Sequence, residues 1–405
     1  MQISPITGDL PGDCVDESRY YDSMIYLDHA ASSPLRPVAR LALLESLEGM
    51  ANAAGRHALG RLASRRVEIA RQAVAELAAC EASEVVFTAG GTEANNLAIW
   101  GTASAIEARG GARRAVLSAL EHACVRKPFE RLARQGWEIE TLAVDSMGRF
   151  DGNELRRLLK GKPSLVSLMA VNNEMGVVQN LETWGPEVRA SGAALHVDAV
   201  QALGYLAPEN WAASLLTLSA HKLGGPQGVG ALILRRDTPW EPVLLGGPHE
   251  QGRRPGTLAV PAIASFGAAA REALSTRDVE TVRLKGLNSL MAEELLNRVP
   301  NLRLIGDTET RAPHILAVSL PGSSASFLLE ELDMLGIAAS SGAACSSLKQ
   351  DPSPVLESMG LTAAEIEGSI RFSLGWSTTE SEIREALHRM IPVMVRASNF
   401  TPRIT

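Results

Sequence analysis

The feature that most constrains the fold is an alternation of short apolar runs with helical patterns between about residues 60 and 240. The helical patterns include Ser64–Cys80, Glu93–Arg109 and Val125–Gln135. Such an alternation predicts an α/β fold, in which a mostly parallel sheet is covered by helices on both faces. The strands that we expect in this sheet are Glu84–Thr88, Ala115–Ala119, Leu165–Val171, Ala194–Val197, Leu215–Ser219 and Val229–Leu234.

The pattern changes near Pro261 and predicts a second, smaller α+β domain. A long helical segment extends to Val299, with a break near Ser275–Arg277. Because the chain has 405 residues, about two domains are expected. We assign residues 36–260 to the large domain, and residues 1–35 and 261–405 to the small one. Its further expected elements are a strand at Ile315–Leu320, a helix at Ser326–Leu335, a strand at Ile370–Leu374 and a last helix from Thr379.

Charge and cysteine usage exclude several classes of protein. The net charge of −7 argues against a nucleic-acid partner or an anionic membrane surface. Cys14, Cys80, Cys124 and Cys345 form no CxxC pair and have no metal-ligand spacing, so we predict free thiols and no metal site. We expect Cys80 and Cys124 to be structural. No signal peptide or membrane span is expected, and a cytoplasmic enzyme is the natural class.

Polar residues follow the expected strands, at the sheet edge where α/β proteins bind ligands. Each has a structural explanation when taken alone. A glycine turn with a threonine N-cap explains Gly91 and Thr92, a structural histidine explains His122, and a turn explains Asn173. Their coincidence at one edge favours a shared site. The residues that follow five strands in chain order are Thr92, His122, Asn173, Asp198 and Lys222.

Lys222 and Asp198 are the most specific of these signals. A lysine at the end of a buried strand is rare unless it is used, and Lys222 is one of only six lysines. An unpaired carboxylate such as Asp198 at the end of an apolar strand is costly, unless a cationic ring nitrogen stabilises it. Together the strand ends predict a site for pyridoxal 5'-phosphate, with Lys222 as the Schiff-base lysine.

The chain also carries a thiol in a run of small residues, Ser340–Ser347, which contains Cys345. Serine, glycine and alanine around a cysteine favour mobility. A lysine-bound electron sink and a mobile thiol are what the removal of sulfur from a sulfur amino acid requires.

With these motifs in order, the sequence resembles the cysteine desulfurases, a group of class V aminotransferases among the fold-type-I pyridoxal-phosphate enzymes. The resemblance extends from about Ile25 to Arg396. It rests on the motifs Tyr26–Ala31, Gly91–Ala98, Val171–Gly176, His196–Gln201, Ser219–Lys222, Arg254–Leu258, Ser340–Cys345 and Ile370–Gly375.

The resemblance implies a role for each matching residue around the cofactor ring. Lys222 would carry the cofactor, Asp198 would pair with its ring nitrogen, and His122 would stack on the ring and handle protons. Gln201 and Asn173 would contact the ring oxygen, and Asn173 would also meet the substrate.

The phosphate and the substrate have implied partners of their own. Thr92, Ser219 and His221 would bind the phosphate, which Gly91 lets the backbone approach. Thr257 would reach the phosphate across the interface of a homodimer, and Arg371 would clamp the substrate carboxylate.

The implied reaction converts L-cysteine to L-alanine and leaves the sulfur as a persulfide on Cys345. The stretch from Cys345 to Pro352–Leu356 is similar to the long-loop subfamily, which passes sulfur to iron–sulfur scaffolds or tRNA-thiolation proteins. Pro255, and the segment Asn52–His57, depart from the family pattern.

Three alternatives stay open from the sequence. A selenocysteine lyase or another class V aminotransferase would share the cofactor residues, although Cys345 argues against plain transamination. An inactive partner-binding regulator would keep the fold alone, which the retained site residues disfavour.

Overall fold

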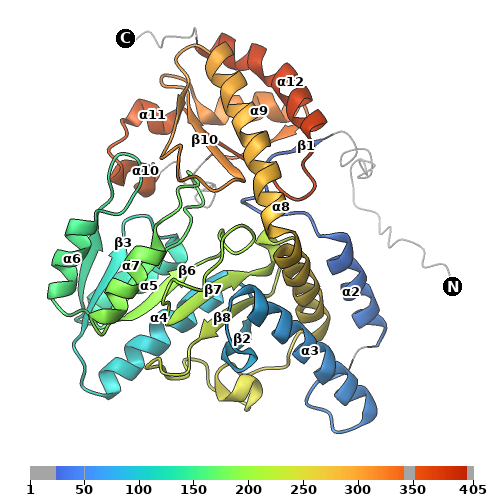
Figure 1. Ribbon diagram of the computed structural model, residues 1–405, viewed down its shortest axis with the longest axis vertical. Coiled ribbons are helices and arrows are strands. Elements are labelled where there is room, and N and C mark those ends of the chain that lie inside the picture. Colours follow the sequence, from blue (N-terminus) through green and yellow to red (C-terminus); the bar gives the residue numbers. More distant parts are fainter. Residues whose placement is uncertain (1–23, 50, 342–351, 399–405) are drawn as a thin grey trace, which may run out of the picture.

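The computed structural model describes residues 24–49, 51–341 and 352–398, and its centre is a seven-stranded sheet (Figure 1). Six of the strands run in the same direction, and only β8 is antiparallel, to both of its neighbours β2 and β7. The carboxyl ends of β2, β3, β5, β6 and β7 therefore lie at the same edge of the sheet. The strand order is β2 (Val85–Thr88), β8 (Gly230–Leu234), β7 (Leu215–Ser219), β6 (Ala194–Asp198), β5 (Leu165–Met169), β3 (Arg114–Ser118) and β4 (Glu138–Leu142).

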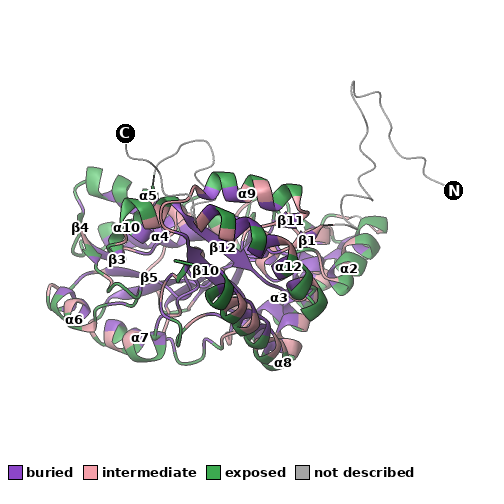
Figure 2. Ribbon diagram, turned by 90° about the horizontal axis from the view of Figure 1, so that it is seen from above, coloured by how far each residue is buried: buried purple, intermediate pink, exposed green. Residues whose placement is uncertain are grey.

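Helices cover both faces of this sheet, because all of its strands except the edge strand β4 are almost entirely buried. On one face, α4 (Gly91–Ala108) and α5 (Ala123–Arg134) share an apolar cluster with the strands. The opposite face is covered by α3 (Ala58–Leu77), α6 (Gly152–Lys160), α7 (Leu181–Ala190) and the first half of α8 (Val260–Arg298). Figure 2 shows the buried strands between these exposed helices.

A second apolar cluster surrounds two smaller sheets above the large one in Figure 1. The antiparallel sheet has the order β12 (Ser369–Ser373), β10 (Ile315–Ser319), β9 (Arg303–Leu304). The other pairs β1 (Ile25–Tyr26) with β11 (Ile337–Ala338). The helices of this cluster, besides the second half of α8, are α9 (Ala325–Met334) and α12 (Glu380–Ser398). The short helices α10 (Pro354–Ser358) and α11 (Ala363–Glu367) place apolar residues in the cluster of the large sheet, and α2 (Pro37–Glu48) packs on α8.

The expected strands and helices are all present, most of them with ends within two residues of the prediction. One expectation is wrong: α8 is continuous over 39 residues, without a break near Ser275–Arg277. The hydroxyls of Ser275 and Thr276 both donate to the carbonyl of Glu272 inside the helix. Their hydrogen-bonding needs are thus met within the helix, and the helix continues past them.

The sequence pattern did not predict β4, which lies between β3 and β5 in the chain, so the five strands that lead to site residues are not successive. Its residues, Glu-Ile-Glu-Thr-Leu, include two charged side chains and are mostly at least partly exposed, as suits an edge strand. Within the described part of the chain, no helix has the length and apolar character that crossing a bilayer requires.

Candidate active site

The carboxyl edge of the large sheet borders a cavity of about 440 Å³, a size typical of small-molecule sites. The structure brings ten of the predicted site residues together around it. These are Gly91, Thr92, His122, Asn173, Asp198, Gln201, Ser219, His221, Lys222 and Arg371.

The two other predicted site residues are Thr257 and Cys345. Thr257 is exposed, in the loop that precedes α8, and is not among the lining residues of its own chain. Cys345 lies outside the described residues.

Lys222 is positioned by the short turn that follows β7. Ala220–Lys222 form one 3-10 turn, and the Lys222 side chain extends to the loop after β1. Its Nζ donates to the carbonyl oxygens of Ala30 and Ala31, each at 2.6 Å. The amine is therefore held at the cavity wall by two main-chain acceptors, in a place that an aldehyde ligand can enter.

Asp198 is the last residue of β6 and is 4% exposed. Its Oδ2 accepts a hydrogen bond from Asn95 Nδ2 at 2.8 Å, and its Oδ1 accepts one from the Val200 main-chain N–H at 3.0 Å. Both oxygens are thus oriented on the cavity wall, as a partner for a cationic ring nitrogen must be.

The start of α4 forms the anion-binding end of the cavity. Gly90 has a φ of +149°, which favours glycine, and Gly91 and Thr92 begin the helix with their N–H groups toward its N-terminus. Ser219 ends β7 beside them. The N-terminal dipole and these donors suit a phosphate.

His221 completes this group from the turn that carries Lys222. Its Nδ1 lies 3.2 Å from Ser32 Oγ. Burial, with a smaller effect from the Lys222 charge, lowers the pKa of His221 to about 4, so the ring is a neutral hydrogen-bonding group at physiological pH.

Arg371 enters the cavity from β12 and is almost completely buried. Its Nη1 donates to the Asn173 carbonyl at 2.8 Å, and its Nη2 contacts Asp28 Oδ1 at 2.7 Å. The buried Nε has no hydrogen-bond partner among the described residues. The guanidinium is thus fixed and retains an unsatisfied donor, which fits the binding of a carboxylate.

The amide side chains of Asn172, Asn173 and Gln201 have different roles at the site. Asn172 makes the turn itself, because its Oδ1 accepts from the N–H groups of Glu174 and Met175. The side chain of Asn173 is left to line the cavity. Gln201 donates to the Ala30 carbonyl at 2.8 Å and so supports the loop that receives Lys222.

Sequence reasoning gave no role in the site to three further lining residues, Asn95, Glu121 and Cys124. Cys124, which we expected to be structural, is half-buried and lies at the cavity beside His122. A usable signal was present for Glu121, which is a carboxyl three residues after the end of the apolar strand β3, much as Asp198 is a carboxyl at the end of β6. Asn95 gave no comparable signal, because it contacts Asp198 and Cys124 only when α4 packs on the sheet.

Glu121 is a buried acid next to a carboxylate. It is 2% exposed, and neither oxygen has a hydrogen-bond partner of good geometry in the described structure. Burial, and then the charge of Asp198, raise the pKa of Glu121 well above its usual range. The side chain therefore favours its neutral form.

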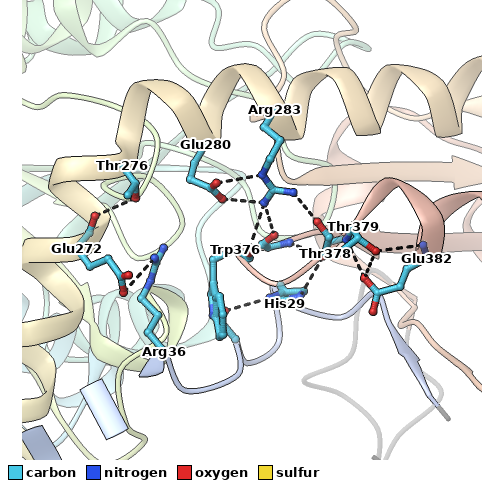
Figure 3. Close-up of polar contacts among 12 residues, drawn as sticks. His29, Arg36, Glu272, Thr276, Glu280, Arg283, Trp376, Thr378, Thr379 and Glu382 are labelled. Carbon is cyan, nitrogen blue, oxygen red and sulfur yellow. Dashed lines mark hydrogen bonds and ion pairs between the residues drawn. The ribbon is translucent and has the colours of Figure 1, made fainter. Parts of the chain in front are cut away.

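The loop that holds the Lys222 amine is fixed to the rest of the molecule by a polar network, shown in Figure 3. Arg283 of α8 donates to the carbonyls of Gly375, at 2.9 Å, and Thr378. The Thr378 hydroxyl lies 3.3 Å from His29 Nε2, and His29 Nδ1 lies 3.0 Å from Ser33 Oγ. Burial, chiefly, lowers the pKa of His29 to about 4, so this histidine is a neutral structural group.

Arg36 fixes the other end of the same loop. Its Nε donates to the Leu223 carbonyl at 2.8 Å, and its Nη1 lies 3.5 Å from Glu272 on α8. Its guanidinium also lies over the Trp376 ring (Figure 3). The main-chain acceptors of Lys222 are consequently anchored from both sides.

The cavity fits pyridoxal phosphate. It offers an amine, an oriented carboxylate and a helix N-terminus with hydroxyl donors, and the buried Asn95 Oδ1 and Arg371 Nε lack partners among the described residues. In those residues, no group of three or more His, Cys, Asp or Glu is arranged to hold a metal ion.

A model of the aminotransferase class-V family matches residues 25–386. The chain belongs to this family, whose cysteine desulfurases depend on pyridoxal phosphate.

The relatives indicate the particular branch. The chain is 39% identical over 385 residues to "Cysteine desulfurase 2" of Trichormus variabilis, covering 94% of this chain and 95% of that protein. A solved "NifS-like protein" has a TM-score of 0.85 at 29% identity and covers 92% of this chain and 99% of its own. A structure of SspA in complex with cysteine has a TM-score of 0.75 at 25% identity and covers 86% and 98%.

Proposed function

We propose that this protein is a pyridoxal-phosphate-dependent cysteine desulfurase, which converts L-cysteine to L-alanine and receives the sulfur as a persulfide on Cys345. One observation carries this proposal: five strands of one sheet deliver an amine, a carboxylate, a histidine, an amide and a helix N-terminus to a single cavity. The desulfurase relatives and the cysteine-bound neighbour support the choice of reaction and substrate.

The chemistry that the cofactor supplies when bound is an electron sink for the substrate α-carbon. Lys222 would hold the cofactor, and its amine, once released, would take the proton from the substrate α-carbon. Asp198, oriented by Asn95 and Val200, would keep a proton on the ring nitrogen. His122, at the N-terminus of α5, would stack on the ring.

The remaining residues bind and orient. Arg371 takes the substrate carboxylate with its unsatisfied donor, and Asn173 meets the substrate beside it. The start of α4 with Thr92, and Ser219 and His221, would hold the phosphate. Gln201 and Asn173 would contact the ring oxygen.

The thiol of Cys345 attacks the substrate sulfur. The carbon–sulfur bond breaks, a sulfur–sulfur bond forms, and a proton replaces sulfur on the substrate carbon, so that L-cysteine and a thiol become L-alanine and a persulfide. Both flanks of the segment that carries Cys345 lie at the cavity. Ser340 pairs with Arg371 through main-chain bonds, and Pro354 and Val355 line the cavity. Cys345 follows Ser341 by four residues, and an extended chain of that length spans up to about 14 Å.

The acceptor of the sulfur is a protein, and we still predict an iron–sulfur scaffold or a tRNA-thiolation relay. We also still predict a cytoplasmic location.

We also propose a homodimer. The exposed side of α2 carries an apolar stripe with an apolar residue at every third position, Val38, Leu41, Leu44 and Leu47, and α3 adds Leu59, Leu62 and Ile69. Thr257, exposed and outside its own cavity, would then serve the second copy of the chain.

Replacing Cys345 by serine tests this function. The Cys345→Ser variant should retain the cofactor but form no persulfide with cysteine, whereas Cys80→Ala, which removes a thiol at the main apolar cluster, should form it at the normal rate. The measurement is persulfide on the protein, by mass spectrometry, together with alanine release. Alanine and persulfide formation by Cys345→Ser at the wild-type rate would refute the proposal.

A further inference from the structure

Hydrogen bonds around His122 determine which of its ring nitrogens carries the proton. His122 is the N-cap of α5, and its Nδ1 accepts a hydrogen bond from the main-chain N–H of Cys124 at 3.2 Å. The Cys124 sulfur lies 2.9 Å from the same nitrogen. A main-chain N–H can only donate, so Nδ1 must be the acceptor, and the proton of the neutral ring is on Nε2.

The same reasoning assigns the role of the thiol. Because Nδ1 carries no proton, the short contact between sulfur and nitrogen requires that the Cys124 S–H donates to it. Two donors from one residue then converge on Nδ1. Both oppose protonation of the ring at this nitrogen, since a hydrogen bond to the neutral form favours that form.

Asn95 fixes the orientation of the thiol. A carboxylate accepts only, so the contact of 2.8 Å with Asp198 places the NH₂ group of Asn95 toward Asp198. The same Nδ2 lies 3.1 Å from the Cys124 sulfur. The amide therefore donates to the sulfur, whose own proton is directed to His122. Asn95 is completely buried, and its Oδ1 has no partner in the described structure, so these two contacts set its orientation.

The cavity is the second sign that this thiol belongs to a site. Asn95, Glu121, His122, Cys124 and Asp198 all line it, and the carboxyl of Glu121 is buried there without a well-formed hydrogen bond in the described structure.

We infer that Cys124, oriented by Asn95, is a positioning residue that keeps His122 neutral with its proton on Nε2. The inference rests on the proposed function, in which His122 stacks on the cofactor and handles protons. It connects Asp198, which faces the ring nitrogen, with His122 through two hydrogen bonds on Cys124. The carboxyls of Glu121 and Glu174 both interact electrostatically with His122, and burial raises the pKa of each.

The direct test is ¹⁵N NMR of histidine-labelled, cofactor-loaded protein across a pH series. In the wild type, the His122 nitrogens should show the tautomer protonated on Nε2. Cys124→Ala removes one of the two donors to Nδ1, so the pH midpoint at which the ring gains its second proton should rise by about one unit. Cys124→Ser keeps a donor and should restore the wild-type midpoint, while Cys80→Ala should leave it unchanged.

The acidic limb of the pH profile of kcat/KM should move in Cys124→Ala by the same amount. An unchanged His122 midpoint in Cys124→Ala, or a wild-type ring protonated on Nδ1, would overturn the inference. The NMR result does not depend on turnover. A protein that lacks desulfurase activity would therefore contradict the proposed function alone, and an unchanged midpoint would contradict this inference alone.

Discussion

Two buried carboxyl groups at the cavity, Asp198 and Glu121, have opposite surroundings. Asp198 accepts hydrogen bonds on both oxygens, whereas Glu121 accepts none of good geometry in the described structure. A donated hydrogen bond stabilises a carboxylate, and burial without one destabilises it. In the sequence, both carboxyl groups look alike, because each lies at or shortly after the end of an apolar strand. The packing around them differs, so that Asp198 is suited to be a charged partner of the cofactor and Glu121 to be a neutral acid.

Glu121 should therefore make the protein less stable as the pH rises. Its pKa is raised in the folded state, so the unfolded chain releases this proton first, and stability is lost progressively above the ordinary value of 4.5. In Glu121→Gln this loss is absent. The free energy of unfolding of Glu121→Gln, relative to the wild type, should increase between pH 5 and pH 8.

Urea unfolding at these two pH values measures the difference. Glu293→Gln, an exposed position on α8, is the control and should give the same difference at both. A difference for Glu121→Gln that does not change with pH would show that Glu121 is ionised in the folded protein.

At the scale of elements, α8 joins the two apolar clusters. Its first half, with Ile263 and Phe266, packs with the large sheet, and its second half, with Leu284 and Met291, packs with the smaller sheets. Arg283 and Glu272 on the same helix anchor the loop that receives Lys222. The position of the site loop thus depends on a straight, continuous α8.

Two glycines of α8 should respond oppositely to the same substitution. A Cβ at Gly267 would lie 2.4 Å from Ala70 Cα of α3, so Gly267→Ala forces the helices apart and should cost about 1–3 kcal/mol. A Cβ at Gly286 meets nothing within 4 Å. Gly286→Ala should instead stabilise the protein by about 0.5–1 kcal/mol, because alanine favours the helix.

Urea midpoints of the two variants give the comparison. Equal shifts, or a stabilised Gly267→Ala, would contradict the close packing of α3 on α8.

Much of this architecture was predictable from sequence for a physical reason: buried strands are continuous apolar runs. Such runs located β7 and β6 and, through them, Lys222 and Asp198. The edge strand β4 was not predicted because its two glutamates interrupt the continuous apolar run by which the buried strands were recognised. Ser275 and Thr276 suggested a helix break, because hydroxyl side chains compete with the backbone unless they bond back within the helix.

Contacts between distant residues were not predictable. Asp28 and Arg371 form an ion pair across 343 positions, and no local pattern of either residue indicates the other. Asn95 joins Asp198 to Cys124 only when α4 and α5 pack beside β6. The sequence therefore predicted which residues surround the cavity, while their partners and protonation emerged from packing.

At the scale of the whole molecule, the apolar stripe on α2 supports the proposed homodimer. Leu41 is 57% exposed and Leu44 is 47% exposed, on consecutive turns. Water contact with several leucines on the exposed side of one helix is unfavourable. A second copy of the chain would cover the stripe and would bring in Thr257.

The double variant Leu41→Glu/Leu44→Glu should therefore be monomeric by sedimentation velocity and should bind pyridoxal phosphate more weakly, because the partner threonine is lost. Val282→Glu is the control, since Val282 is 74% exposed on α8, away from the stripe, and its variant should remain dimeric. A wild-type protein that is monomeric, or a double variant that remains dimeric, would contradict this interface.

The central claim is that Lys222 carries the cofactor, and chemical trapping tests it most directly. The loaded protein is reduced with borohydride, digested, and mapped by peptide mass spectrometry. We predict that the pyridoxyl group is on the peptide that contains Lys222 and that Lys222→Ala yields no labelled peptide. A label on any other of the six lysines, or no label on the wild type, would contradict the account.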